Sequence, residues 1–499
     1  MKSSSLVALA GLLSLALSIS QTLAAEATPD NWANWRGPNF NGTSLSAKPP
    51  TSWSEEENIK WKVPIAGSGS SSPIIWGEKL FLLTAVPQEK PDDADAVDEE
   101  KTDEAPSERP RERQPQGDSA EPPRRGPGGF GRGPGGPAGP GGRGGRPGGF
   151  GRGGFGRGGE APTTPVEFTV LCLDKTTGKE IWSKVATQQI PHEAGHGTNT
   201  FASSSVVTDG KIVIAFFGSR GIFCYDIDGG LLWERDLGKQ QTRNAFGEGS
   251  TPALYGDTVI VPWDHEGDSF VLALDAKSGK DLWKVDRDEA TSWATPVVTE
   301  FNGNAQVIMN GTTRVRSYDL KSGDLLWECG GQATNPIPTP IIYEDMAICM
   351  TGYRGYAVYA IKLNAKGDVT KSDDAIAWSR TDVGPYIASA TLYDDKLYVT
   401  KSRDGILYCL DAKTGETIYG PERLPEASTL YSSLVAADGK VYVSDRDGTT
   451  VVLDAGPEFK VLATNQIEEG IDASLAFSGS QIFLRGSDHL YCIEQKDAK

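Results

Sequence analysis

The 499-residue chain carries a formal net charge of −18, and 38% of its residues are hydrophobic and 9% aromatic. That composition is sufficient for a sizeable core. A surface this acidic repels nucleic acid and anionic lipid overall and favours solubility, so we expect no nucleic-acid partner.

The N-terminus has the pattern of a secretory signal peptide. Lys2 precedes an apolar stretch from Leu6 to Ile19, and small residues that suit cleavage follow as far as Ala24. The apolar stretch is shorter than the roughly 20 residues that a membrane span needs, and no later stretch is apolar enough. We therefore expect residues 1–24 to be cleaved near Ala24. The mature chain is then expected to be periplasmic or extracellular, without a transmembrane segment.

Residues 25–57 precede the repeats and form an N-terminal extension. They include the aromatic and turn-rich stretch NWANWRGPNFNGTS at 31–44. This composition favours packing across one face of the following domain over a role as a ligand flap.

From residue 58 to residue 494 the chain is built of repeats of about 40 to 50 residues. Each repeat has four short runs rich in Val, Ile, Leu, Tyr and Phe, separated by Gly, Asp, Asn and Ser, as strands are. Four strands in a repeat of this length indicate a β-propeller. We predict an all-β, eight-bladed propeller with four-stranded blades. The blades begin at small residues near Ser72, Ser204, Thr251, Thr295, Thr339, Ala390, Ser433 and Ser474.

The last repeat stops after its third strand. The stretch Asn58–Ala66, which contains Trp61, has the character of a fourth strand and lies before the first repeat. A ring closed in this way leaves no unpaired final strand. We therefore predict that the N-terminal strand completes the eighth blade and that residues 495–499 form a short C-terminal tail.

Residues 88–164 interrupt blade 1 between its second and third strands. The segment opens acidic (EKPDDADAVDEEKTDEAPSE) and becomes rich in arginine and glycine, with almost no apolar residues. It cannot bury enough apolar surface to offset its ordering entropy, so we expect it to be disordered. Its role is either that of a solvated insertion or that of a polyanion-binding segment.

One phrase, D-x-x-(S/T)-G-x-x-x-W, recurs in most repeats. The aspartate is expected to accept backbone hydrogen bonds in a tight turn, the glycine to supply a positive φ, and the tryptophan to wedge between neighbouring blades. These roles are structural and require no ligand. The residues assigned to them are Asp174, Gly178, Trp182, Asp226, Trp233, Asp275, Gly279, Trp283, Asp319, Gly323, Trp327, Asp411 and Gly415.

With this phrase at Asp174, Asp275 and Asp319, and looser copies at Asp226 and Asp411, the chain resembles the pyrroloquinoline quinone (PQQ)-like repeat propellers. The resemblance covers residues 58–494 apart from the insertion. The family includes quinoprotein dehydrogenases, which hold PQQ and a calcium ion, and cofactor-free scaffolds such as the propeller lipoprotein of the outer-membrane β-barrel assembly machine. The opening WANWRGPNFNGTS is most similar to a third group, exported propellers of environmental bacteria. The resemblance implies the fold and leaves the activity open.

The quinoprotein dehydrogenases also carry a disulfide between adjacent cysteines, whereas none of the six cysteines here are adjacent. Four of the six occupy the same point of the repeat and are expected to lie too far apart to bridge. We interpret them as small buried hydrophobic residues. Cys329 and Cys349 are the one pair that we keep as a disulfide candidate.

The loops offer few groups suited to chemistry. His192 and His196 have the spacing of metal ligands on a helix, but the residues around them predict a loop. Asp264 and His265 are adjacent, and an aspartate can tune the protonation of a histidine. Further arginines occupy loops that could line a face. The candidates for a face or for the channel are His196, Arg220, Asp264, His265, Arg354, Arg403 and Arg446.

Taken together, these patterns favour an exported, non-catalytic propeller that binds protein partners or assists assembly in the cell envelope, with no cofactor. The alternative is a PQQ- and calcium-dependent oxidoreductase resembling alcohol dehydrogenases. A third hypothesis is binding of a polyanion or glycan by the arginine-rich part of residues 88–164.

Overall fold

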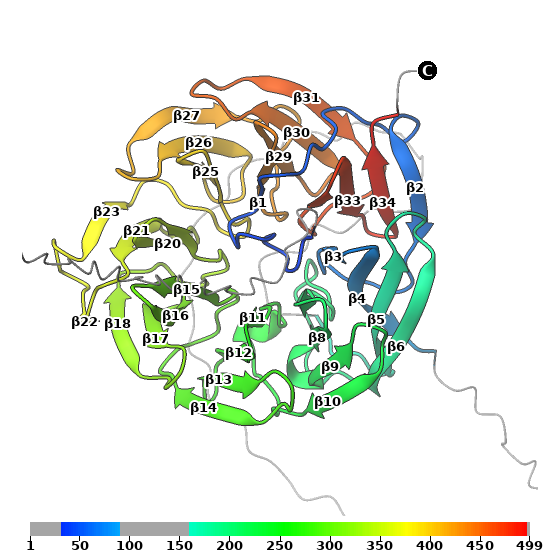
Figure 1. The fold of residues 1–499 in the computed structure, drawn as a ribbon, viewed down its shortest axis with the longest axis horizontal. Coiled ribbons are helices and arrows are strands. Elements are labelled where there is room, and N and C mark those ends of the chain that lie inside the picture. Colours follow the sequence, from blue (N-terminus) through cyan, green and yellow to red (C-terminus); the bar gives the residue numbers. More distant parts are fainter. Residues whose placement is uncertain (1–30, 90–158, 497–499) are drawn as a thin grey trace, which may run out of the picture. The chain divides into compact units, whose positions relative to one another are not determined.

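The computed structural model describes residues 31–89 and 159–496, which form eight largely antiparallel β-sheets. Figure 1 looks down the axis around which these sheets are arranged, and the chain colours follow the ring from blue to red. The prediction of an all-β, eight-bladed propeller is confirmed. We number the sheets as blades 1 to 8 along the chain.

Blades 1 to 4 are formed by the first half of the repeats. Their strands are β3 (Ile74–Trp76), β4 (Lys79–Pro87), β5 (Val166–Asp174) and β6 (Glu180–Gln189) in blade 1; β7 (Val207–Thr208), β8 (Ile212–Phe216), β9 (Ile222–Asp226) and β10 (Leu231–Arg235) in blade 2; β11 (Ala253–Tyr255), β12 (Thr258–Trp263), β13 (Phe270–Asp275) and β14 (Asp281–Asp286) in blade 3; and β15 (Val297–Phe301), β16 (Asn304–Met309), β17 (Arg314–Asp319) and β18 (Leu325–Gly330) in blade 4. Two short 3₁₀ helices, η1 (Gly218–Arg220) and η2 (Arg243–Ala245), lie in the connections.

Blades 5 to 8 follow the same plan with two additions. Their strands are β19 (Ile341–Tyr343), β20 (Met346–Thr351), β21 (Ala357–Lys362) and β23 (Ile376–Arg380) in blade 5; β24 (Thr391–Tyr393), β25 (Lys396–Thr400), β26 (Ile406–Asp411) and β27 (Thr417–Arg423) in blade 6; β28 (Val435–Ala437), β29 (Lys440–Ser444), β30 (Thr449–Asp454) and β31 (Val461–Gln466) in blade 7; and β32 (Ala476–Ser478), β33 (Gln481–Arg485), β34 (His489–Glu494) and β2 (Ile59–Pro64) in blade 8. The short strands β1 (Thr43–Ser44) and β22 (Gly367–Asp368) extend blades 7 and 4.

Burial falls from the second and third strands of a blade to its fourth. In blade 3, β12 and β13 are buried along nearly their whole length, whereas β14 alternates between exposed and half-buried residues. The inner strands have a neighbouring blade on each face, so both sets of side chains must be apolar. The fourth strand lies at the rim of the ring and therefore keeps a polar face.

The eighth blade is closed by the N-terminal strand, as predicted. Strand β2 pairs antiparallel with β34, with Trp61 opposite Cys492, so the two ends of the repeat region share one sheet. Separating either strand would expose an unpaired edge. The ring therefore closes on itself without a free final strand.

A belt of hydroxyl groups connects the blades around the centre. In seven of the eight blades, the backbone N–H of the Ser or Thr that precedes the first strand donates to the equivalent hydroxyl in the next blade, at 2.9–3.3 Å. This geometry explains the small residues at the start of each repeat. Two of the predicted starts, Ser204 and Ala390, are displaced by one residue from the belt. Its members are Ser72, Ser205, Thr251, Thr295, Thr339, Ser389, Ser433 and Ser474.

The segment from residue 31 to residue 57 starts at the centre of the ring and passes outward to β2, as the blue chain in Figure 1 shows. Trp32 is fully buried and pairs with Ile75 of blade 1, and β1 pairs in parallel with β28 of blade 7. The buried guanidinium of Arg36 donates to the carbonyl oxygens of Leu434, at 3.0 Å, and Ala390. Burial lowers the pKa of Arg36 to about 9, so the group is still charged at neutral pH.

The blades have two different ends. We call the end that carries the turns from first to second and from third to fourth strand the turn end. The opposite end, which carries the connections from second to third strand and from one blade to the next, is the loop end. The insertion starts and finishes at the loop end, where Gln88 N–H donates to Pro165 O at 2.9 Å. The signal-peptide prediction for residues 1–24 lies outside the described residues, and so does the disorder prediction for residues 88–164 except at 88–89 and 159–164.

At the turn end, the recurrent aspartate closes the turn between the third and fourth strands. In blade 3, Asp275 Oδ1 accepts hydrogen bonds from the N–H and hydroxyl of Ser278 at 2.8 and 2.6 Å. Gly279 follows with a φ of +66°, a conformation that strains any residue with a side chain. The same turn recurs at Asp174 with Gly178, Asp319 with Gly323, and Asp411 with Gly415, and a shorter form occurs at Asp226 with Gly229.

The tryptophan of one blade lies on the turn glycine of the next. The indole N–H of Trp233 donates to Ala276 O at 2.9 Å, and a Cβ on Gly279 would lie 2.7 Å from the indole ring. The indole ring fills the space that a side chain at the turn would occupy. The glycine is therefore needed both for the conformation of the turn and for the contact with the tryptophan. The pairs are Trp61 on Gly178, Trp182 on Gly229, Trp233 on Gly279, Trp283 on Gly323 and Trp378 on Gly415.

Trp327 of blade 4 departs from this arrangement. It is fully buried, and its indole N–H donates to Gln306 Oε1 of its own blade at 3.2 Å. The chain between β21 and β23 makes an excursion in which β22 pairs in parallel with β18, with Gly367 opposite Trp327. This extra strand pairs with the outer strand of blade 4 beside Trp327, which has no turn glycine of the next blade against it as the five tryptophans above do.

Candidate functional site

The structure places all seven face or channel candidates at the loop end. Arg220, Arg354, Arg403 and Arg446 each lie between the second and third strands of a blade, as do Asp264 and His265, and His196 lies in the connection from blade 1 to blade 2. The seven candidates named from the sequence therefore lie at the same end of the propeller. The residues divide into two groups there, one near blades 2 and 3 and one near blades 5 to 7.

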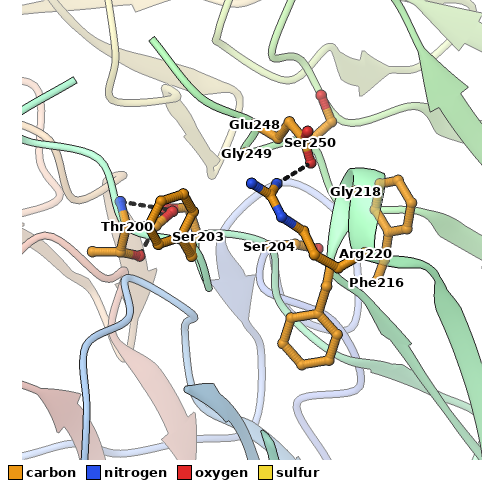
Figure 2. A pocket seen from close by; sticks show the side chains of 11 residues that line it. Thr200, Ser203, Ser204, Phe216, Gly218, Arg220, Glu248, Gly249 and Ser250 are labelled. Atoms are coloured by element: carbon orange, nitrogen blue, oxygen red, sulfur yellow. Dashed lines mark hydrogen bonds and ion pairs between the residues drawn. The ribbon is translucent and has the colours of Figure 1, made fainter. Parts of the chain in front are cut away.

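Arg220 of the first group lines a small pocket formed by blade 2 and the connections on either side of it, drawn in Figure 2. Asp264 lines a neighbouring pocket. The buried Arg220 points at Glu248, and its Nη1 lies 3.0 Å from Glu248 Oε2. The same carboxylate accepts hydrogen bonds from the N–H and hydroxyl of Ser219 at 2.7 and 2.5 Å. Arg220 also lies over the ring of Phe201, 5.1 Å from its centroid. Both charges are therefore matched within the protein.

Asp264 and His265 do not interact with each other through their side chains. Asp264 forms a two-point ion pair with the buried Arg287 at 2.7 and 3.0 Å and accepts a hydrogen bond from Ser292 at 2.6 Å. His265 Nδ1 instead accepts the N–H of Gln241 at 3.0 Å. The aspartate holds an arginine in place, and the histidine fastens a loop.

His192 and His196 also point to different partners. His192 Nε2 contacts Gln240 O at 2.7 Å, and His196 Nδ1 contacts the hydroxyl of Thr198 at 2.8 Å. Both residues lie in a loop, as expected. Within residues 31–89 and 159–496, no group of three or more His, Cys, Asp or Glu side chains is arranged to hold a metal ion.

The second group meets at Tyr431, in the connection from blade 6 to blade 7. Its hydroxyl shares a hydrogen bond with Thr198 at 3.2 Å and accepts another from Arg403 Nη1 at 3.5 Å. The guanidinium of Arg446 lies over the Tyr431 ring, 4.3 Å from the centroid. A two-point ion pair with Asp472, at 2.6 and 3.0 Å, fixes Arg446 in this position.

A pair of stacked tyrosines lies beside Tyr431. The rings of Tyr353 and Tyr386 are 4.7 Å apart and inclined by 23°. Burial and the neighbouring Tyr353 raise the pKa of Tyr386, while Arg403 acts in the opposite direction. The exposed Arg354 places its guanidinium over the Tyr353 ring at 5.2 Å. We call Tyr353, Tyr386, Arg403, Tyr431 and Arg446 the mouth cluster.

The sequence identified the arginines of the mouth cluster but missed its tyrosines. A usable signal exists, because an aromatic residue stands two or three positions before the belt hydroxyl in several blades. Trp293 precedes Thr295 in this way, and Tyr431 precedes Ser433. Such a residue lies where the chain enters the centre of the ring from the loop end. Its position relative to the belt therefore marks it as a lining residue.

The cysteines lie in the cores of the blades. All six are buried and free, including Cys329 and Cys349, so the structure holds no disulfide between this candidate pair. Burial raises the pKa of the Cys172 thiol, and of the equivalent thiols of the other repeats, to about 12. They pack as small apolar residues.

An eight-bladed ring built on the D-x-x-(S/T)-G-x-x-x-W phrase defines the class of this protein as a PQQ-like repeat propeller. The family described as "Outer membrane protein assembly factor BamB" matches residues 166–421, just over half of the chain. The chain belongs to this family.

Curated relatives come from both branches of the class. Methanol dehydrogenase [cytochrome c] subunit 1 of Methylobacterium organophilum is 22% identical over 304 residues, which cover 52% of this chain and 45% of that protein. Outer membrane protein assembly factor BamB of Francisella tularensis is 24% identical over 173 residues, 34% of each chain. The matches span less than half the length of these relatives. A solved europium-containing methanol dehydrogenase shares the fold, with a TM-score of 0.57, 10% identity, and coverage of 94% of this chain and 98% of that one.

Among the described residues, no cluster of carboxylates fits the calcium ion of the dehydrogenase branch. Calcium takes six to eight oxygen ligands, with carboxylates among them. At the loop end, Glu248 is held by Arg220, and Asp264 by Arg287. A third carboxylate, Glu289, is held by Arg316 and by Thr313. Each of these three carboxylates therefore already has its counter-charge, and no two cysteines of the chain are adjacent, as the disulfide of the dehydrogenases requires.

Proposed function

We propose that the chain is a non-catalytic propeller that binds protein partners through its loop end and serves as a binding or assembly scaffold in the cell envelope. The observation that carries this proposal is the mouth cluster. The second-to-third strand hairpins of blades 5, 6 and 7 and the connections that follow blades 5 and 6 bring half-buried tyrosine and arginine side chains together there. Tyrosine and arginine are the residues most enriched at the energetic centres of protein interfaces.

The turn end supports the same proposal, because side chains and backbone of the protein itself already occupy much of its surface. Its glycines lie against the tryptophans of neighbouring blades, and the segment from residue 31 to residue 57 occupies the inner strands next to it. The chemistry that varies from blade to blade is thus concentrated at the loop end. Membership in a family described by outer-membrane protein assembly, together with the signal-peptide pattern, supports an envelope location. No helix among the described residues is long and apolar enough to span a membrane.

Site-specific photo-crosslinking tests this proposal. A benzophenone amino acid replaces the exposed Arg354 at the loop end or, in the matched control, the exposed Lys277 in a turn of blade 3. After irradiation in intact cells, we expect discrete crosslinked protein bands from position 354 and none from position 277. Equal bands from both positions, or bands from position 277 alone, would contradict binding through the loop end.

The second candidate is a PQQ-dependent oxidoreductase, which the relation to a methanol dehydrogenase over 304 residues favours. Its test uses the purified mature chain mixed with PQQ and calcium and then desalted. A quinone absorbance that persists after desalting, with dye-linked oxidation of alcohols, would establish this candidate and overturn the scaffold proposal. We expect the quinone to separate from the protein and no alcohol oxidation above the buffer control.

A further inference from the structure

We propose that the mouth cluster is a binding site for an acidic polypeptide segment that also contains aromatic residues. The inference rests on the proposed function, because it names the chemistry of the partner that the loop end recognises. It is carried by the geometry around Tyr431, by the neighbouring tyrosine stack, and by the local charge.

The guanidinium of Arg446 is held in a fixed position beside Tyr431. Asp472 accepts two hydrogen bonds from the guanidinium of Arg446. The guanidinium carbon lies 4.3 Å from the centroid of the Tyr431 ring. A guanidinium offers five N–H donors, and the two bonds to Asp472 use the Nε and one Nη group. Arg403, on the equivalent hairpin of blade 6, reaches the hydroxyl of the same tyrosine. Two guanidinium groups from neighbouring blades are thus held around one phenol.

The tyrosine stack extends this surface toward blade 5. Tyr386 lies between Tyr353, on which it stacks, and Arg403, which affects its pKa. A hydrogen bond with Asn335 also acts on the Tyr386 hydroxyl, and Asn335 Oδ1 accepts a hydrogen bond from Arg243 at 3.2 Å. The rings are held from several sides yet remain half-buried, so part of each is open to a ligand. Ordered aromatic rings lose little entropy when they bind.

Arg403 and Arg446 act electrostatically on the groups around Tyr431. The pKa of His196 is lowered first by burial and then by the positive charges of Arg403 and Arg446. The charged group that acts on Tyr386 is likewise an arginine. Two guanidinium groups therefore lie close to Tyr431, one of them paired with Asp472, in a chain whose net charge is −18. Guanidinium groups attract carboxylates and repel cationic segments.

These features together select the ligand class. Planar guanidinium groups recognise carboxylates by paired hydrogen bonds, and open tyrosine rings favour aromatic side chains. The contacts are spread over hairpins of three blades and two connections between blades, which suits an extended segment with several side chains. An acidic polysaccharide shares the carboxylates but not the aromatic rings, so it serves as a competing ligand in the test.

The test is a fluorescence-anisotropy titration of the purified mature chain. The probe is a fluorescein-labelled peptide of alternating aspartate and tyrosine. Comparison peptides alternate lysine with tyrosine or aspartate with serine, and oligogalacturonate is the glycan competitor. We expect the aspartate–tyrosine peptide to bind most tightly. Its Kd is expected to rise about tenfold in Arg403→Met and in Tyr431→Ser, as for residues at the centre of an interface.

Two further variants keep the result interpretable. Arg446→Lys retains the charge but loses the planar fork, and we expect it to weaken binding less than Arg403→Met does. Lys277→Met removes one positive charge at the turn end and should leave Kd unchanged. Each variant is first checked for a wild-type circular dichroism spectrum, and if Tyr431→Ser fails to fold, the Kd of Arg403→Met alone decides the outcome.

The inference is overturned if Arg403→Met binds the aspartate–tyrosine peptide as wild type does, or if the lysine–tyrosine peptide binds at least as well. It is also overturned if oligogalacturonate binds the cluster more tightly than the peptide. Crosslinks from position 354 that persist in Arg403→Met would leave the scaffold function intact while removing this site. Absence of crosslinks from position 354 would instead count against the proposed function itself.

Discussion

The two ends of the propeller use their residues in opposite ways. At the turn end, one arrangement recurs from blade to blade, and Trp233 on Gly279 is repeated by Trp283 on Gly323. At the loop end, the residue between second and third strands changes from Arg220 in blade 2 to Asp264 in blade 3. A feature that recurs in every blade cannot single out one binding site. The repeats therefore encode the ring, whereas the residues that break the repeat encode recognition.

The largest expected effect is at the turn-end side of blade 4. Trp327 is fully buried among apolar side chains and bonds to Gln306. Trp327→Ala should lower the free energy of unfolding by about 3–5 kcal/mol, as large truncations in a core do. Urea denaturation measures the change. Leu325→Ala is the control, because Leu325 lies on the same strand with 48% of its surface exposed. A loss below about 1 kcal/mol for Trp327→Ala would contradict the structural role assigned to the tryptophans.

The next effect separates the strain of a turn from the contact with a tryptophan. Gly279 has a φ of +66° and would place a Cβ 2.7 Å from the Trp233 ring, whereas Gly256 has a φ of +54° with nothing within 4 Å. Both alanine variants strain the backbone by about 1–3 kcal/mol. Only Gly279→Ala must also displace the indole, so it should be the less stable of the two. Equal unfolding free energies would show that the indole contact contributes nothing.

A smaller effect is expected from pH at the loop end. The pKa of His196 is lowered in the folded state by burial and by the arginines nearby. As the pH falls below the ordinary value of about 6.5, the unfolded chain takes up this proton more readily than the folded chain. The contribution of His196 to stability is thus present above that pH and is lost as the pH falls. Wild type should therefore lose more stability than His196→Gln between pH 7.5 and 5. The opposite difference would contradict a lowered pKa of His196 in the folded state.

The smallest effect on stability is expected for Arg354. Its side chain is exposed and contacts the ring of Tyr353. Arg354→Ala should change the free energy of unfolding by less than about 0.5 kcal/mol, as surface substitutions do. A loss of several times that amount would mean that this loop-end residue holds the ring together rather than facing a partner.

Much of the fold could be predicted because its determinants are local and repeated. Strand pattern, turn chemistry and the spacing from Asp275 to Trp283 occur within single repeats, so counting them gave eight blades and the closing strand. The belt was located only to within one residue at Ser205 and Ser389. Neighbouring small residues look alike in sequence, and the belt depends on which hydroxyl faces the next blade.

The candidate site was only partly predictable. Arg403 and Arg446 stood out because equivalent hairpins carried the same residue type, whereas Tyr431 is marked only by its position two residues before Ser433 of the belt. Its importance depends on contacts between residues far apart in the chain, such as the hydrogen bond with Thr198. Likewise, the pairing of Asp264 with Arg287 rather than with His265 is set by the packing of two loops. Such contacts cannot be predicted from which residues are neighbours in the sequence.

The turn end builds the ring, while the loop end remains available for binding. The most direct test of this division compares the urea unfolding free energy of the double variant Arg354→Ala/Arg403→Ala with that of Trp327→Ala. We predict that the double variant stays within about 1 kcal/mol of wild type, while Trp327→Ala loses about 3–5 kcal/mol. A double variant as unstable as Trp327→Ala would show that the loop-end arginines hold the fold together, and it would contradict this division of roles.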